Sequence, residues 1–308
     1  MFTGEQHAPM PLSDSEQAAL DDPQKAVSWA AQHDMPDWLR PELERSLGAE
    51  LAEICEQSKS RAPIFLRVNL RKASLASVQD ELARDNIQCL TVDGRKTALQ
   101  VIENPRRLAN SQAYLEGRIE LQDAHSQAIC AALPAAGRVL DYCAGGGGKI
   151  LAYAALNDGA LFAHDANAGR LADLSHRAKR GGHKVKILSN SDCRVQAPFD
   201  LVVCDVPCSG SGSWRRAPSG KWSLTFDQLE GLRSTQREIL QEAARLVRSG
   251  GELAYVTCSL LKSENTDQVE WFVEHSSSFE LAQTTQYYPS ESGDGFFFAR
   301  LTRRNPAT

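Results

Sequence analysis

The sequence predicts an α/β protein whose larger part is a doubly wound, mainly parallel β-sheet. From residue 138 onward, short apolar runs rich in Val, Leu and Phe alternate with amphipathic helical stretches. This alternation is typical of parallel strands joined by helices that cover both faces of a sheet. A glycine cluster follows the first run, and two strand candidates with no helix between them end the pattern. We therefore expect a seven-stranded sheet that closes with a hairpin.

The seven expected strands are RVLDYC, ALFAHD, VKILSN, DLVVCDV, ELAYVTC, FELAQTTQ and GFFFARLT. Helical stretches lie between most of them, among them NAGRLADLSHRAKRGG, DQLEGLRSTQREILQEAARLVRSGG and SENTDQVEWFVEH. In an open sheet of this kind, ligands bind outside the carboxyl ends of the strands. Residues that directly follow the expected strands are therefore the candidates for a functional site.

Two smaller parts precede this sheet domain, which we place at residues 121–308. Residues 1–60 carry apolar residues at helical spacing, broken by Pro36 and Pro41, and predict an N-terminal helical segment. Residues 61–120 predict a small α+β unit. In that unit the strand candidates PIFLRVNL, IQCLTV and ALQVIEN accompany the helical stretch SLASVQDELARDN.

The composition is that of a globular protein, with 308 residues and a net charge of −5. The chain has no run of about 18 apolar residues and no signal-peptide pattern, so we expect a cytoplasmic protein without a membrane span. Its eight cysteines include no C-x-x-C pair, which argues against a zinc site and a disulfide framework. We expect no metal. Since nucleic-acid enzymes usually present basic surfaces, the acidic balance requires any RNA contact to be local.

A glycine loop, residues 143–149, follows the first strand of the sheet. A Walker A loop would need Gly at Cys143 and Ser or Thr at Ile150, so phosphate binding of that type fails. The dinucleotide pattern G-x-G-x-x-G also fails, because its last glycine would fall on Ile150 or Leu151. S-adenosylmethionine carries no phosphate and needs neither pattern, so the loop predicts this methyl donor. The expected contacts in the loop are Cys143, Ala144, Gly145, Gly146, Gly147, Gly148 and Lys149.

Acidic residues at three further strand ends fit the same donor. Asp165 ends the second strand, where a carboxylate can accept both ribose hydroxyls. Asp192 follows the third strand, where it could meet the adenine edge, and Asp205 ends the fourth. Capping of a helix or turn is the structural alternative for Asp165 and Asp192. Taken together, the loop and acids favour a class I methyltransferase, which has a Rossmann-like sheet of seven strands.

Two cysteines follow neighbouring strands of the expected sheet. Cys208 lies in CDVPCSGSG and Cys258 in VTCS, so both should face the donor pocket. A thiolate that adds to carbon 6 of a cytosine makes carbon 5 nucleophilic, which solves the problem of methylating that carbon. Asp205 can hydrogen-bond the polar edge of the ring. Cys204 lies within a strand, and we interpret it as a structural residue. The residue chemistry does not say which cysteine attacks.

These motifs resemble those of the Nop/Sun family of RNA cytosine-C5 methyltransferases, especially its bacterial 16S rRNA members. DYCAGGGGK is similar to the family's D-x-C-A-A-P-G-G-K, and DVPCSGSG to its D-x-P-C-S-x-x-G. WRRAPSGKW, Gln236, TCSLLKSEN and DGFFFARL follow in the family's order, and PIFLRVN is similar to its RNA-recognition-like unit. The likeness covers about residues 26 to 302. DNA cytosine enzymes have the P-C motif but lack T-C-S.

The resemblance implies a role for each matching position. Cys258 would be the nucleophile, and Cys208 would assist release of the product. Asp205 and Lys149 would contact the target base. The glycine loop, Asp165, Asp192 and Asp205 would line the donor site. The chain departs from the family pattern at Gly145, Gly146 and Ile150, where the family has Ala, Pro and Thr.

The loop after Cys208 combines cations with aromatic residues, which suits a flipped base and its flanking phosphates. We expect RNA contacts from Arg215, Arg216 and Lys221. The partner is RNA, either rRNA or tRNA, and we expect a monomer. Two rival functions remain: a tRNA cytosine-C5 methyltransferase, and a non-catalytic RNA-binding or ribosome-assembly factor that retains the fold.

Overall fold

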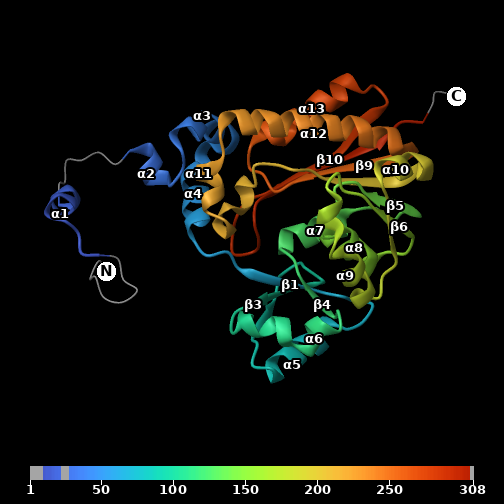
Figure 1. The fold of residues 1–308 in the computed structure, drawn as a ribbon, viewed down its shortest axis with the longest axis horizontal. Coiled ribbons are helices and arrows are strands. Elements are labelled where there is room, and N and C mark those ends of the chain that lie inside the picture. The colour runs from blue at the N-terminus through green and yellow to red at the C-terminus, as the bar shows by residue number, and fades with distance from the viewer. Residues whose placement is uncertain (1–9, 22–27, 306–308) are drawn as a thin grey trace.

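The computed structural model describes residues 10–21 and 28–305, and Figure 1 shows their arrangement. A large sheet with helices on both sides occupies the upper part of the view, and the small α+β unit lies below it. Parts of the predicted N-terminal helical segment lie outside the described residues. No helix within the described ranges combines the length and the apolar character that crossing a membrane requires.

The large sheet has seven strands in the order β10-β11-β9-β8-β5-β6-β7, so the predicted fold class is confirmed. The five strands from β7 to β9 pair in parallel, and β11 pairs antiparallel with both β9 and β10. The strands are β5 (Arg138–Asp141), β6 (Ala160–Ala163), β7 (Val185–Ile187), β8 (Phe199–Asp205), β9 (Val247–Thr257), β10 (Phe279–Tyr287) and β11 (Phe296–Arg303).

Two hydrophobic cores form, one on each face of this sheet, because successive residues of a strand point to opposite faces. Val139 packs among α7, α8 and α9, whereas Leu140 packs among α10, α12 and α13. The helices of the sheet domain are α7 (Ala124–Ala132), α8 (Gly148–Leu156), α9 (Leu174–Gly181), α10 (Asn190–Gln196), α11 (Ser219–Ser223), α12 (Phe226–Leu246) and α13 (Thr266–His275). Because β5, β8 and β9 pair in parallel, their carboxyl ends lie at one edge of the domain.

The small α+β unit is an antiparallel sheet of order β2-β3-β1-β4 backed by two helices. Its core packs Leu66 and Val68 of the sheet against Val78 and Leu82 of the longer helix. The unit consists of β1 (Ile64–Val68), α5 (Leu75–Arg84), β2 (Cys89–Thr91), β3 (Ala98–Val101), α6 (Gln112–Leu115) and β4 (Ile119–Leu121). The sequence pattern missed β4, because Glu120 interrupts its apolar residues, whereas the equally short β2 and β7 lie in longer apolar runs.

The N-terminal helices pack against the sheet domain instead of forming a core of their own. Leu39, Leu43 and Ile54 share a cluster with Trp214 and Leu260, which lie in the loops after β8 and β9. These helices are α2 (Trp29–His33), α3 (Arg40–Leu47) and α4 (Leu51–Lys59), whereas α1 (Asp14–Leu20) has no residue in this cluster and its described side chains are exposed. The helical segment therefore supports the loops that carry the two candidate cysteines.

Candidate active site

The two candidate cysteines meet at the ends of β8 and β9. The Sγ atoms of Cys208 and Cys258 are 3.4 Å apart, and both side chains are partly buried. The hydrogen bond between the sulfur atoms lowers the pKa of Cys258 and raises the pKa of Cys208 well above its usual value. Nearby Lys149 also lowers the pKa of Cys258. The pair is therefore polarised so that Cys258 loses its proton more readily than Cys208.

Lys149 and Asp205 form an ion pair beside the thiols. Lys149 Nζ lies 2.6 Å from Asp205 Oδ2 and 5.5 Å from the centre of the Phe296 ring. Burial lowers the pKa of Lys149, but Asp205, together with Cys130 and Asp141, raises it by more, so the pKa of this lysine is raised. The side chain of Asp205 is 36% exposed and can reach a ligand while Lys149 holds it.

Glu264 fastens the two cysteine loops to each other. Its carboxylate is fully buried and accepts hydrogen bonds from the Ser209 backbone at 2.8 Å and from Ser259 Oγ at 2.6 Å. Ser209 and Ser259 directly follow the two cysteines, and Gln236 Nε2 donates to Glu264 from α12 at 3.1 Å. The resemblance drew attention to TCSLLKSEN, but only the structure shows what its glutamate does.

The glycine loop lies at the end of β5 beside a cavity of about 290 Å³. Asp165 Oδ2 accepts a 2.9 Å hydrogen bond from the Gly145 backbone, and Asp165 Oδ1 accepts another from Asn167. Each carboxylate oxygen has a second lone pair, so Asp165 can still accept from a ligand. Positive φ angles of 50° at Gly145 and 81° at Gly147 explain the glycines at these two positions. The residues that line the cavity include Tyr142, Cys143, His164, Asp165, Arg170 and Asn190.

Comparison with known proteins gives a family for this fold and site. The model of the family described as 16S rRNA methyltransferase RsmB/F matches residues 129–302, which is more than half of the chain. The chain belongs to this family. A second family model, the RsmF/B-like ferredoxin-like domain, matches residues 35–109, which include much of the small α+β unit. The family consists of S-adenosylmethionine-dependent methyltransferases, so the predicted family and cofactor class are confirmed.

Individual relatives agree with the family model. The ribosomal RNA small subunit methyltransferase B of Shewanella oneidensis is 30% identical, covering 88% of this chain and 67% of that protein. The protein of the same name from Escherichia coli is 32% identical, covering 87% and 66%. The crystal structure of PH0851 superposes with a TM-score of 0.82 at 30% identity, covering 96% of this chain and 70% of that one. The chain thus spans about two thirds of the length of these curated relatives.

Asp192 does not line the cavity of this RsmB/F-family chain in the ligand-free structure. It forms a capping box with Ser189 at the start of α10, and its carboxylate is exposed. The Ser189 hydrogen bonds lower the pKa of Asp192. Asn190 lines the cavity instead. The donor contact of Asp192 stays a prediction, and what the structure shows is the capping role.

Two of the three cations predicted to contact RNA are buried in the structure. Arg215 is buried in an ion pair with Asp294 at 2.6 Å, and both side chains are at most 2% exposed. Lys221 is equally buried and pairs with Asp34. Both cations are paired inside the protein, where they stabilise the loop, and their RNA contacts stay a prediction. Arg216 pairs with the same Asp294, but its side chain is 37% exposed and its RNA contact stays a prediction.

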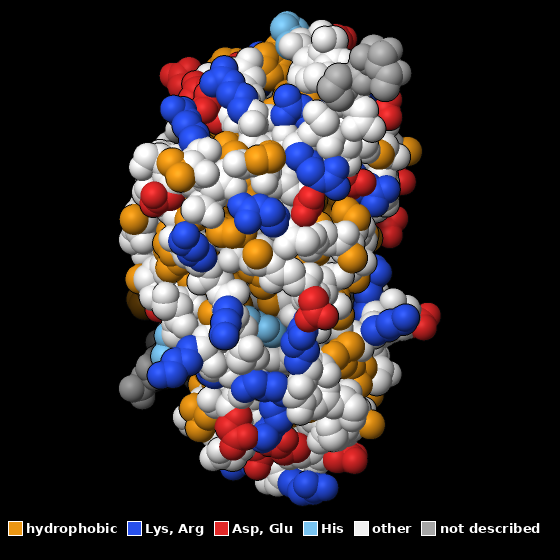
Figure 2. Space-filling view, turned by 90° about the vertical axis from the view of Figure 1, so that its right-hand side faces the viewer, with side chains coloured by type: hydrophobic (Ala, Val, Ile, Leu, Met, Phe, Trp, Pro, Cys, Tyr) orange, Lys and Arg blue, Asp and Glu red, His pale blue; other side chains and the backbone are white. Residues whose placement is uncertain are grey.

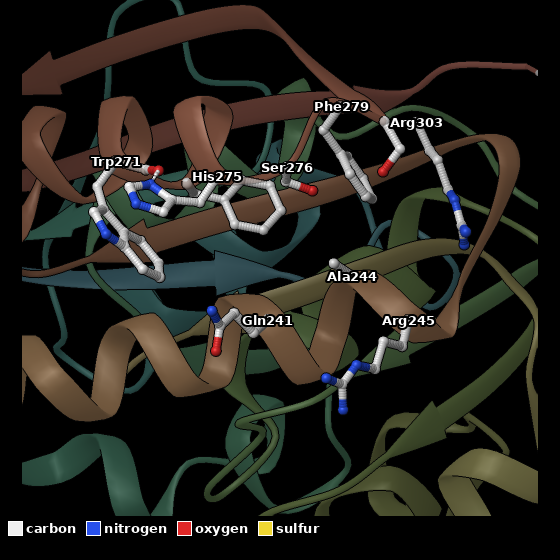
Figure 3. Close-up of a pocket in the computed structure, with 10 residues that line it drawn as sticks. Gln241, Ala244, Arg245, Trp271, His275, Ser276, Phe279 and Arg303 are labelled. Atoms are coloured by element: carbon white, nitrogen blue, oxygen red, sulfur yellow. Dashed lines mark hydrogen bonds between the residues drawn. The ribbon is translucent and has the colours of Figure 1, made fainter.

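Two other surfaces are possible binding sites. Figure 3 shows a cavity of about 310 Å³ between the last turns of α12 and α13, where Gln241 and Arg245 lie below Trp271 and His275. It lies at the edge of the sheet opposite to the cysteine pair, because α12 ends where β9 begins. Figure 2 shows the right-hand face of Figure 1, on which basic side chains are spread out with acidic ones among them. Neither surface gathers the predicted site residues.

Proposed function

We propose that this chain transfers a methyl group from S-adenosylmethionine to carbon 5 of a cytosine in RNA, with 16S rRNA as the substrate. The observation that carries the proposal is the 3.4 Å contact between Cys208 and Cys258, beside the Lys149–Asp205 ion pair. A pair of thiols of opposite polarity suits covalent catalysis on a pyrimidine ring. The names of the relatives support rRNA as the substrate class, and such an enzyme would act in the cytoplasm as a monomer.

The residues of the chain divide the covalent chemistry between them. The Cys258 thiolate forms a bond to carbon 6 of the cytosine, and the displaced electron pair makes carbon 5 nucleophilic. Asp205 accepts a hydrogen bond from the nitrogen edge of the ring and holds the base in place. Once carbon 5 carries the methyl group, its proton is lost to solvent, the electron pair of that C–H bond restores the ring double bond, and the bond to Cys258 breaks as the thiolate leaves. Cys208 assists this release through its hydrogen bond to the leaving sulfur.

The glycine loop and Asp165 fit the methyl donor, which supplies the methyl group as an electrophile when bound. Cys143 and Asp165 line the cavity. Asp165 Oδ2 accepts from Gly145 and lies 3.4 Å from Arg170 Nη1, whereas Oδ1 accepts only from Asn167 among the described residues and keeps a lone pair for the donor. Asp165→Ala removes a charged acceptor, and a hydrogen bond to a charged group is worth roughly 1.5–3 kcal/mol. Calorimetry with S-adenosylhomocysteine should therefore show at least about tenfold weaker binding. Unchanged affinity would remove Asp165 from the donor site.

Labelled methyl transfer to purified RNA, followed by bisulfite mapping in cells that lack the gene, tests the whole proposal. We expect one or more 5-methylcytosines to disappear from 16S rRNA while tRNA keeps its own. Loss from tRNA alone would favour the tRNA rival. Donor binding without transfer to any RNA would favour a non-catalytic factor.

A further inference from the structure

An arginine contacts the outer side of the glycine loop and also binds the small α+β unit. Nη1 of Arg177, on α9, donates a 2.5 Å hydrogen bond to the carbonyl oxygen of Gly146. Nη2 and Nε of the same guanidinium donate to Glu120 Oε2 at 2.9 and 3.2 Å. Glu120 lies on β4 and its side chain is only 9% exposed. Arg177 therefore links the loop to the small unit through one planar group.

A second contact joins the same two parts. Arg67, on β1, is buried and donates a 2.9 Å hydrogen bond to the carbonyl oxygen of Gly148. Gln122 Nε2 lies 3.3 Å from that oxygen and its own carbonyl accepts from Arg67. The backbone carbonyls of Gly146 and Gly148 thus both accept hydrogen bonds on the side of the loop that faces the small unit.

The departure from the family pattern at Gly146 matches this arrangement. A Cβ atom at Gly146 would lie 3.0 Å from Arg177 Nη1, so any larger residue presses on the guanidinium. The family's proline would stiffen the loop by restricting its own backbone. In this chain, glycine at position 146 leaves space for the Arg177 guanidinium, which stabilises the loop by its hydrogen bond to the Gly146 carbonyl.

We propose that Arg177, oriented by Glu120, is a positioning residue that keeps the glycine loop in its donor-binding conformation. Through this one contact, Glu120 of the small α+β unit contributes to the affinity of the catalytic domain for S-adenosylmethionine. This inference rests on the proposed function, because it assumes that the donor binds at this loop. It extends that function because Glu120, on β4 of the small unit, acts on the donor-binding loop through Arg177.

Calorimetric titration with S-adenosylhomocysteine tests the inference. Arg177→Ala should raise Kd by about tenfold or more, since a hydrogen bond from a charged donor to the loop is lost. Arg177→Lys should restore part of the affinity, because an ammonium can hold one acceptor but not both. In turnover assays, KM for the donor should rise while kcat at saturating donor stays near that of the wild type.

Arg180→Ala is the matched control. Arg180 pairs with the other oxygen of Glu120 and stacks on Tyr114, 4.2 Å from the ring centre, but it forms no hydrogen bond to the glycine loop within the part of the chain that the structure describes. Donor affinity should stay unchanged in this variant. Equal losses in Arg177→Ala and Arg180→Ala would overturn the inference, since general loosening of the small unit would explain both.

Gly146→Ala approaches the contact from the loop side and leaves every ion pair in place. It should weaken donor binding when Arg177 is present and have no further effect in the Arg177→Ala background. The inference is overturned, while the proposed function stands, if Gly146→Ala lowers donor affinity equally in both backgrounds. It is also overturned if Arg177→Ala by itself leaves donor affinity at the wild-type value. If the wild type binds no S-adenosylhomocysteine, the proposed function fails and the inference fails with it.

Discussion

Cys208 and the loop that follows it are adjacent in sequence, yet the cysteine site and this loop use polar groups in opposite ways. Cys208, Cys258 and Asp205 are all partly exposed, and each retains capacity to bind something else. In η5 (Ser211–Arg216) and α11, by contrast, Arg215 and Lys221 are buried and paired within the protein. In the first region, polar groups remain accessible to a ligand. In the second, buried ion pairs stabilise the conformation of the loop.

The difference shows that residue type alone does not separate a binding surface from a structural ion pair. Arg215 donates to the backbone carbonyls of Ser290 and Gly293 as well as to Asp294. These contacts fix the segment before β11 against the loop after β8. The buried pair therefore supports the wall of the site, and substitutions in the two regions should fail in different ways.

Substitution of the two cysteines should have the largest effect, on activity and not on folding. Cys258→Ala should lower methyl transfer by roughly 10³-fold or more, as expected when a nucleophile is removed. Cys208→Ala should still attack the base but release it slowly, so a covalent protein–RNA band should survive a denaturing gel. Adding Cys258→Ala to that variant should erase the band. A band from Cys258→Ala alone would reverse the two roles.

Asp294→Ala should mainly cost stability. It leaves the Arg215 guanidinium buried without its carboxylate, and breaking a buried pair in this way costs about 3–5 kcal/mol. Urea unfolding followed by circular dichroism measures the loss. Glu280→Ala is the control, because the Glu280–Arg304 pair is more than half exposed and is worth only about 0–1 kcal/mol. Similar losses in both variants would contradict the structural role of Asp294.

The pH dependence of Cys258 should move when its partner is removed. The Cys208 hydrogen bond lowers the pKa of Cys258, whereas burial raises it. Cys208→Ala removes the lowering contribution, so the pKa of Cys258 rises and less thiolate exists at neutral pH. Mass-spectrometric rates of Cys258 alkylation by iodoacetamide should follow a profile displaced to higher pH. A profile that does not move, or moves to lower pH, would show that Cys208 does not stabilise the thiolate.

The smallest effect is expected from Arg216. Arg216→Ala should reduce the slope of log affinity for RNA against log salt by at most about 1, the contribution of a single phosphate contact. Filter binding across a salt series measures it. Arg215→Lys keeps the buried charge and should leave the slope unchanged. An equal change in both variants would mean that Arg215 reaches the RNA after all.

The sequence was sufficient for the sheet and for the residues at its strand ends. Alternating apolar runs and helical stretches specify a parallel sheet, and in such a sheet the ends of β5, β8 and β9 must share an edge. For that reason the sequence alone assigns Lys149, Asp205, Cys208 and Cys258 to one pocket. Strand β4 was not predicted, because Glu120 leaves it without the apolar run that marks the equally short β2 and β7.

Only the tertiary structure decided what each charge does. Arg215 and Arg216 are adjacent and alike in sequence, but one is buried with Asp294 and the other is partly exposed. Glu264 joins its own loop to Ser209, which lies 55 residues earlier in the chain, and Glu120 reaches the glycine loop through Arg177. The energy of a charge depends on its solvent exposure and on partners far away in the chain, which a local sequence pattern does not contain. The sequence by itself determined the fold and the reacting groups, while long-range packing determined which of the remaining polar residues support them.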